Sequence, residues 1–291
     1  MTDLKRPRVF ARIALVRLLL FFFLLLLVYA VAQQAVGYSL HHVPKHLVDA
    51  VALAGAAVVS LASIGLYVFL VRWLERRGAK ELAPLRGTPL LIGGMLLAFF
   101  MFCVVYAILW GLGVAAWHGF AGYAAVATFA AMAIASGVCE ELIFRGGVYR
   151  VLEDGFGSTV ALILSGALFG ALHLVNHNAT LFSAVAIALE AGVLLGAAYA
   201  ATRNLWLPIG IHIGWNFTEG GVFGAAVSGG GGGKGILDMP LSGAPLLTGG
   251  VFGPEASIIT VIVCTAAGLY FVIRTIRRGR WVPASFHMML D

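Results

Sequence analysis

Charged side chains are scarce in this sequence. Aspartate, glutamate, lysine and arginine make up 11% of the 291 residues, whereas hydrophobic residues make up 61%. An ordinary globular domain is about one quarter charged, so this composition excludes a typical soluble domain. The mean hydropathy of +0.97 indicates a membrane protein instead.

Cysteine and metal-binding motifs are also sparse. The three cysteines, Cys103, Cys139 and Cys264, lie in apolar segments and form no CxxC pair. This excludes a disulfide framework and a cysteine-rich metal site. The chain has no HExxH spacing and no nucleic-acid-binding motif, so its net charge of +6 predicts contact with anionic lipid headgroups rather than nucleic acid.

Long apolar runs dominate what is present. A helix that crosses about 30 Å of hydrocarbon needs roughly 20 apolar residues, and runs such as LLLFFFLLLLV lack the alternation of barrel strands. The sequence therefore predicts an all-α, polytopic transmembrane helical bundle of about eight spans. These are Ile13–Val36, Leu47–Val71, Leu90–Gly113, Ala121–Leu152, Thr159–Val175, Leu181–Ala201, Leu207–Val227 and Ala256–Ile276.

The distribution of lysine and arginine predicts the topology. Cytoplasmic loops collect these residues, and an eight-span arrangement with a cytoplasmic N-terminus puts all but Lys45 and Lys234 of the 19 on the inner side. That count includes Arg145 and Arg150. Both termini are therefore predicted to be cytoplasmic.

The first apolar segment also has features of a signal peptide. Basic KRPR precedes it, and Ala30–Ala32 has the pattern of a cleavage site. Its apolar stretch is longer than that of a usual signal peptide, and cleavage would reverse the charge bias. We therefore expect this segment to remain as the first span.

The chain has no evident linker or repeat, so residues 1–291 are predicted to form a single integral membrane domain with a motif core at 121–227. The one long loop, Ser228–Glu255, is rich in glycine and is expected to be a flexible connector. A lid over an outward-facing cavity is the alternative. Glu255 follows a proline just before the last helix. We expect it to cap this helix, because a carboxylate interacts favourably with the positive end of the helix dipole.

Two adjacent acids lie inside the fourth span. Glu140 and Glu141 project about 100° apart around a helix, so they cannot easily share one partner. Glu141 and Arg145 are spaced i, i+4, which favours an ion pair and leaves Glu140 free. A structural ion-pair network that braces the bundle is the alternative interpretation.

Three further polar residues lie in later spans. His173 is in the fifth span, and His212 and Asn216 share one face of the seventh. Taken singly, each is equally typical of contacts between helices. Counting about 1.5 Å of rise per residue from the inner helix ends puts them and Glu140 in one layer roughly 8 Å thick near the bilayer middle.

This layer depends on the length of the fourth helix. The helix must continue past its two glycines to Leu152, because an end at Arg145 would move Glu140 towards the membrane surface. Glu190, in the sixth span, lies close to the same layer. It is predicted either to line a shared cavity or to pair with a neighbouring polar group.

The order of these motifs resembles a known family. Glu140-Glu141-x-x-x-Arg145, Phe169-x-x-x-His173 and His212-x-x-x-Asn216 on successive apolar helices are similar to the CPBP family. That family comprises CAAX proteases and bacteriocin-processing enzymes, including the Ras-converting CAAX endopeptidase. The motifs span about a quarter of the chain.

The resemblance implies an intramembrane endopeptidase. In that interpretation Glu140, assisted by His173, activates a water, His212 and Asn216 stabilise the oxyanion, and Glu141 with Arg145 supports them. A carboxylate at low dielectric is suited to base chemistry. No cofactor is favoured, but zinc is possible, because Glu140, His173 and His212 could provide its ligands.

Other functions remain open from the sequence. Intramembrane acids also serve proton relays, so a transporter is one alternative, and a non-catalytic immunity-type binding protein is another. The expected partners are the lipid bilayer and a peptide or lipidated protein. The expected location is the bacterial cytoplasmic membrane.

Overall fold

The computed structural model describes residues 14–284, and the basic KRPR motif lies outside this range. Every predicted apolar segment is helical over most of its described part, although the fourth becomes helical only at Val126 and the seventh ends its helix at Val222. Two short strands pair antiparallel at one end of the bundle, β1 (Gly119–Phe120) with β2 (Leu237–Asp238). The helices are α1 (Ala14–His42), α2 (Val48–Leu70), α3 (Gly87–Gly111), α4 (Val126–Glu141), α5 (Arg150–Leu172), α6 (Leu181–Ile187), α7 (Val193–Thr202), α8 (Trp206–Asn216), α9 (Pro245–Thr248) and α10 (Ile258–Arg277).

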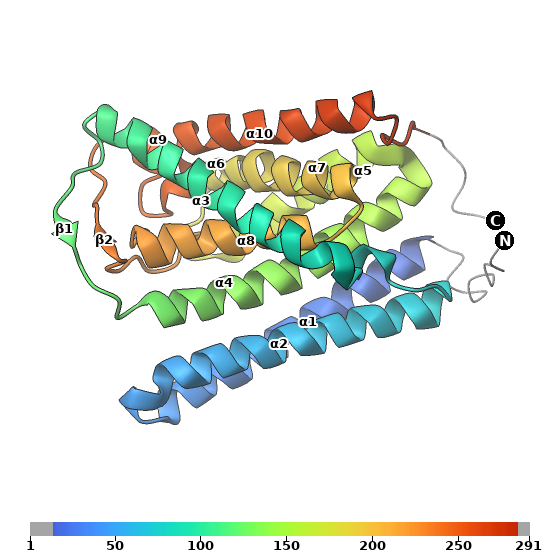
Figure 1. The fold of residues 1–291 in the computed structure, drawn as a ribbon, viewed down its shortest axis with the longest axis horizontal. Helices are drawn as coiled ribbons and strands as arrows, with labels where there is room; N and C mark the ends of the chain where they lie inside the picture. The colour runs from blue at the N-terminus through green and yellow to red at the C-terminus, as the bar shows by residue number, and fades with distance from the viewer. Residues whose placement is uncertain (1–13, 285–291) are drawn as a thin grey trace.

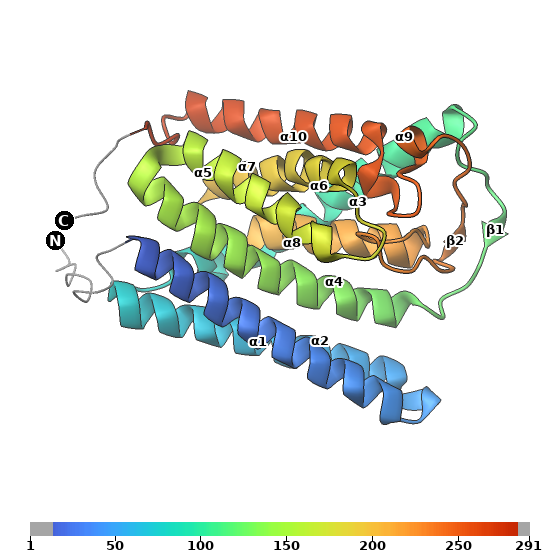
Figure 2. The same ribbon diagram turned by 180° about the vertical axis from the view of Figure 1, so that it is seen from behind.

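The helices form one elongated bundle (Figures 1 and 2). α1 and α2 run antiparallel along one side, and α2 packs on α4. α8 lies inside the bundle between α3 and α4, while α10 covers α7. Gly210 permits the closest approach of α8 to α3, since a Cβ at this position would lie 2.2 Å from the Leu91 carbonyl oxygen. Small residues at such crossings are typical of membrane helices.

Several spans contain π-helical turns. A π turn at Leu142–Tyr149 continues α4 into α5, so the fourth helix does pass its two glycines and reach Leu152, as the predicted layer requires. The chain reverses at Gly157, whose φ of 81° lies in the region that favours glycine. Further π turns occupy Val71–Glu75, Ala188–Gly192 and Phe217–Val222.

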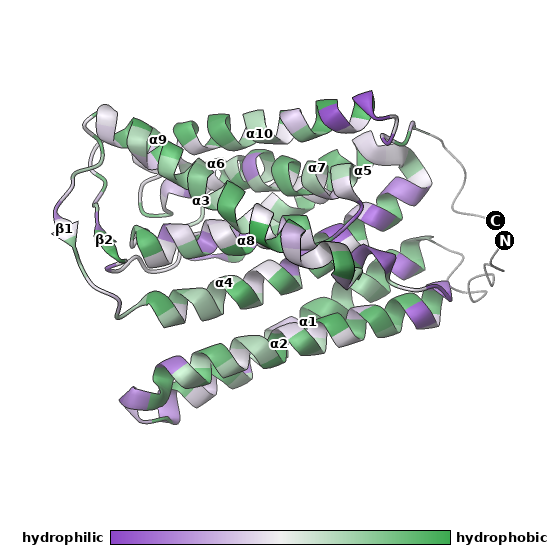
Figure 3. Cartoon of the chain, viewed as in Figure 1, coloured by the Kyte–Doolittle hydropathy of each residue, from purple (hydrophilic) through white to green (hydrophobic). Residues whose placement is uncertain are grey.

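Six helices of the described chain are long and apolar enough to cross a membrane. One of them, Val126–Val175, includes the fourth and fifth predicted spans, whereas the helix with His212 is not among the six. The all-α polytopic bundle is therefore confirmed, and the count of eight spans stays a prediction. Figure 3 shows hydrophobic residues along the helices and hydrophilic ones gathered near their ends.

The start of α1 and the end of α10 lie at the same end of the bundle (Figure 1). Their cytoplasmic location stays a prediction. Arg150 lies at this end, but Arg145, which the topology argument counted with it, is 1% exposed inside the bundle. Its role is therefore in the interior rather than at the membrane surface.

An ion-pair cluster holds this end together. Arg150 donates from Nη1 to both oxygens of Glu75, at 2.8 and 2.9 Å. Arg77 donates to both oxygens of Glu81 at 2.8 Å, and the Tyr67 hydroxyl donates to Glu81 at 2.5 Å. These contacts join the α2–α3 connection to the start of α5. Burial alone would raise the pKa of Glu81, but the hydrogen bonds from Arg77 and Tyr67 bring it below its ordinary value.

Glu81→Gln should lower the free energy of unfolding at pH 7 by about 1–3 kcal/mol, because it removes a buried charged acceptor. The folded pKa of Glu81 is depressed, so its contribution is complete above the unfolded pKa and is lost as the pH falls through the folded value. The difference from wild type should therefore narrow at acid pH. Thermal unfolding in detergent at pH 7 and at about pH 4 measures both effects.

The exposed neighbour Lys80 gives the control variant, Lys80→Gln, which should unfold like wild type. An equal loss in Glu81→Gln at both pH values would contradict the ion-pair explanation.

Candidate active site

The Glu141 carboxylate lies at the centre of the polar layer. It is fully buried, and its Oε1 accepts hydrogen bonds from Arg145 Nη1 at 2.8 Å and from His212 Nδ1 at 2.9 Å. The Arg145 guanidinium also donates to the Ala191 carbonyl at 2.9 Å and lies 4.7 Å from the centre of the Phe169 ring. The predicted ion pair between Glu141 and Arg145 is therefore present. These contacts connect α4 to α8 and to the π turn Ala188–Gly192.

Glu140 faces the other nitrogen of His212. Its Oε2 lies 3.9 Å from His212 Nε2, and its side chain is 20% exposed. The expectation that the two adjacent acids cannot share a partner is therefore wrong. Imidazole has nitrogens on two sides of its ring, so His212 contacts one acid with each nitrogen.

His173 and Asn216 are each fixed by one hydrogen bond. His173 Nδ1 lies 2.8 Å from the Phe169 carbonyl oxygen, which can only accept, so Nδ1 carries the hydrogen and Nε2 has a free lone pair in the neutral ring. Asn216 Nδ2 donates to Ser136 Oγ at 3.0 Å. The described structure contains no hydrogen bond or ion pair between His173 and Glu140.

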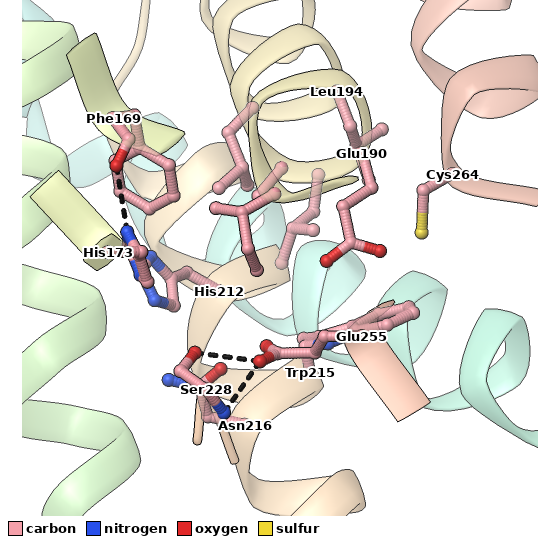
Figure 4. A pocket seen from close by; sticks show the side chains of 14 residues that line it. Phe169, His173, Glu190, Leu194, His212, Trp215, Asn216, Ser228, Glu255 and Cys264 are labelled. Carbon is pink, nitrogen blue, oxygen red and sulfur yellow. Dashed lines mark hydrogen bonds between the residues drawn. The ribbon is translucent and has the colours of Figure 1, made fainter. Parts of the chain in front are cut away.

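A cavity of about 30 Å³ brings residues from five segments together (Figure 4). A cavity of this size can hold water where polar side chains face it. His173, His212 and Asn216 line it, so the predicted meeting of α5 and α8 is found, whereas the two acids of α4 lie beyond its lining. The other lining residues are Phe169, Ile187, Glu190, Ala191, Leu194, Leu195, Ile211, Trp215, Ser228, Glu255 and Cys264.

Glu190 lines the cavity. This is one of the two positions that the sequence predicted for it. Glu190 is 2% exposed, and its Oε2 has no hydrogen-bond partner within residues 14–284. Its sequence signal was its position as an acid in the middle of an apolar span.

The two ends of the glycine-rich segment are held by hydrogen bonds, and the flexibility expected for the rest of it stays a prediction. Ser228 donates to Glu255 Oε2 from its backbone nitrogen and its hydroxyl, at 2.7 Å each. Asn176 and Asn178 donate to the carbonyls of Ser228 and Gly229 at 3.0 and 3.2 Å. These hydrogen bonds satisfy backbone groups that glycine alone would leave free. Ser228 and Glu255, the two ends of the segment, line the cavity, and the lid alternative stays a prediction.

The capping role expected for Glu255 is also wrong. The N-cap of α10 is Ser257, whose hydroxyl accepts from the Ile259 backbone nitrogen. Glu255 lies in the preceding 3₁₀ turn, Pro254–Ala256, and lines the cavity. No motif in the sequence predicts its contact with Ser228, which lies 27 residues earlier in the chain.

The alternative zinc ligands do not form a metal site in this conformation. Within residues 14–284, no three histidine, cysteine, aspartate or glutamate side chains are grouped closely enough to hold a metal ion. Both nitrogens of His212 face the acids of α4, and His173 Nδ1 faces a carbonyl. The preference for chemistry without a cofactor stays a prediction.

The comparison with known families agrees with the motifs. Residues 122–218, about a third of the chain, match the family described as type II CAAX prenyl endopeptidase, Rce1-like. This range contains all three motifs and confirms the resemblance to CAAX proteases. No curated protein and no solved structure matches the chain.

At the level of the family, the match supports a CAAX-type intramembrane protease. The apolar helices and the match together indicate an integral membrane protein.

Arg145→Ala should destabilise the protein by about 3–5 kcal/mol, because it leaves the buried Glu141 charge without its main partner. Thermal unfolding in detergent measures this loss. Arg277→Ala, at the exposed end of α10, is the matched control and should change stability by less than about 1 kcal/mol. Equal stability of both variants would show that the Glu141–Arg145 pair does not brace the site.

Proposed function

We propose that the protein is an endopeptidase of the bacterial cytoplasmic membrane that hydrolyses a peptide bond of a membrane-anchored or lipidated protein. The observation that carries this proposal is the arrangement of His212. It lies between two carboxylates and also lines a water-sized cavity beside His173 and Asn216. The family match over the same segment supports the reaction class.

Glu140 is the proposed general base. It is partly exposed, whereas Glu141 is fully buried and already accepts two hydrogen bonds. Glu140 would take a proton from a water while the water oxygen attacks the substrate carbonyl carbon. The free Nε2 of His173 assists by accepting a hydrogen bond from the same water. The proton then passes to the leaving amine.

His212 and Asn216 are the proposed oxyanion donors. Asn216 uses one amide hydrogen for Ser136 and keeps the second for a substrate oxygen. His212 donates to Glu141 from Nδ1, so it must also carry a proton on Nε2 to donate to the oxyanion. The negative charge of Glu141 stabilises this cation. Such preorganised donors are most effective where bulk water is excluded.

Purified protein in detergent should cleave quenched peptides, including a prenylated CAAX peptide. Glu140→Gln and His173→Ala should lower kcat by roughly 10²–10⁴-fold, the usual contribution of acid–base groups. His212→Ala and Asn216→Ala should each cost roughly 10²–10³-fold. Cleavage is followed by fluorescence and mass spectrometry.

Glu219→Gln and His118→Ala are the controls, because Glu219 is a buried acid outside the cavity lining and His118 is exposed. Full activity of Glu140→Gln would contradict the proposed base. Proton or solute flux in liposomes without any cleavage would support the transporter instead.

Activity should persist after complete removal of metals, because the proposed mechanism uses only side chains. The test is incubation with chelators followed by elemental analysis and the same peptide assay. Loss of activity that added zinc restores would overturn the metal-free mechanism. The effects of the four variants would then need to be explained through metal binding.

A further inference from the structure

Three glutamates form a second polar cluster on the far side of the cavity from α4. Glu190 comes from the π turn between α6 and α7, Glu219 from the π turn after α8, and Glu255 from the turn before α10. All three are at least 96% buried. Glu255 lies within electrostatic reach of both of the others.

The cluster has no cation of its own. Within residues 14–284, both oxygens of Glu219 and Oε2 of Glu190 have no hydrogen-bond partner, and Glu255 accepts from the neutral Ser228. Ionised carboxylates repel one another, so Glu255 cannot neutralise either of its neighbours, Glu190 and Glu219. Buried charge that is not neutralised is costly. A cation from outside the chain would relieve this cost at Glu190.

Glu190 is accessible to such a cation. Its carboxylate points into the cavity, towards Trp215 and Glu255 (Figure 4). The rest of the wall beside it is apolar, with Ile187 and Leu194. A carboxylate next to an indole is a typical environment for an organic cation, because the face of the indole ring also attracts positive charge.

We propose that Glu190, with Glu255 and Trp215, forms a subsite for a primary ammonium group of the substrate peptide. The cavity of about 30 Å³ accommodates a compact ammonium better than a planar guanidinium. The ammonium comes either from a lysine side chain or from a free amino terminus. It would bind opposite His173 and His212, so the subsite would determine which peptide bond reaches Glu140. This subsite rests on the proposed peptidase function.

The test compares peptides that differ only in this charge. One series has a single lysine at successive positions, with acetyl-lysine and norleucine as neutral counterparts, and a second series has a free or an acetylated amino terminus. In one of the two series, wild type should cleave the charged peptide with a kcat/KM about tenfold higher than that of its neutral counterpart. This is the effect expected for one hydrogen bond between charged groups. The series that shows the effect identifies the source of the ammonium.

Glu190→Gln should abolish this preference while cleavage of the neutral peptide changes less than about threefold. Glu190→Asp keeps the charge and should retain part of the preference. Glu219→Gln is the matched control, because it removes a buried acid of the same cluster that does not line the cavity, and it should keep the preference. Gel filtration and thermal unfolding confirm that each variant is folded.

Binding of the same peptides to Glu140→Gln separates the two proposals. Charge-dependent binding that Glu190→Gln removes, without cleavage by wild type, would overturn the peptidase and support the subsite. Cleavage without a charge preference, or with a preference that persists in Glu190→Gln, would overturn the subsite and leave the peptidase standing. Loss of the preference in Glu219→Gln as well would show a general charge effect and also overturn the subsite.

Discussion

The burial of the Glu141 carboxylate is the constraint on which the site depends. A carboxylate without access to water requires several strong donors, and Arg145 and His212 supply them from two different helices. The two hydrogen bonds to Oε1 of Glu141 therefore fix the position of α8 relative to α4. They also fix the orientation of the His212 ring, so that its second nitrogen faces Glu140.

The π turns place the other acids. Among residues 14–284, the four π turns each contain or directly follow a glutamate. A π turn adds one residue to the helical ladder and changes the direction of the side chains beside it. At Leu142–Tyr149 the helix continues without a break, which keeps Glu140 deep in the bundle. Two other π turns, Ala188–Gly192 and Phe217–Val222, contain Glu190 and Glu219 of the second cluster.

Much of the fold and part of the site followed from the sequence. The apolar runs were long enough to predict the long helices, and the i, i+4 spacing predicted the contact between Glu141 and Arg145. The contact of Glu140 with His212 was harder to predict, because it depends on which side of the imidazole ring faces each helix. The contacts at the start of the Ser228–Glu255 segment were not predicted, because their donors, Asn176 and Asn178, lie about 50 residues earlier in the chain.

The sequence alone determined that the chain is an apolar helical bundle with a few ionisable groups at similar depth, because length, hydropathy and helical spacing are local properties. Only the tertiary structure decided which of these groups meet. Contacts such as Glu141 with His212, or Glu255 with Ser228, depend on how helices rotate about their axes and where loops return. Packing between distant segments sets both, because it decides which buried charges and donors come within reach of a partner.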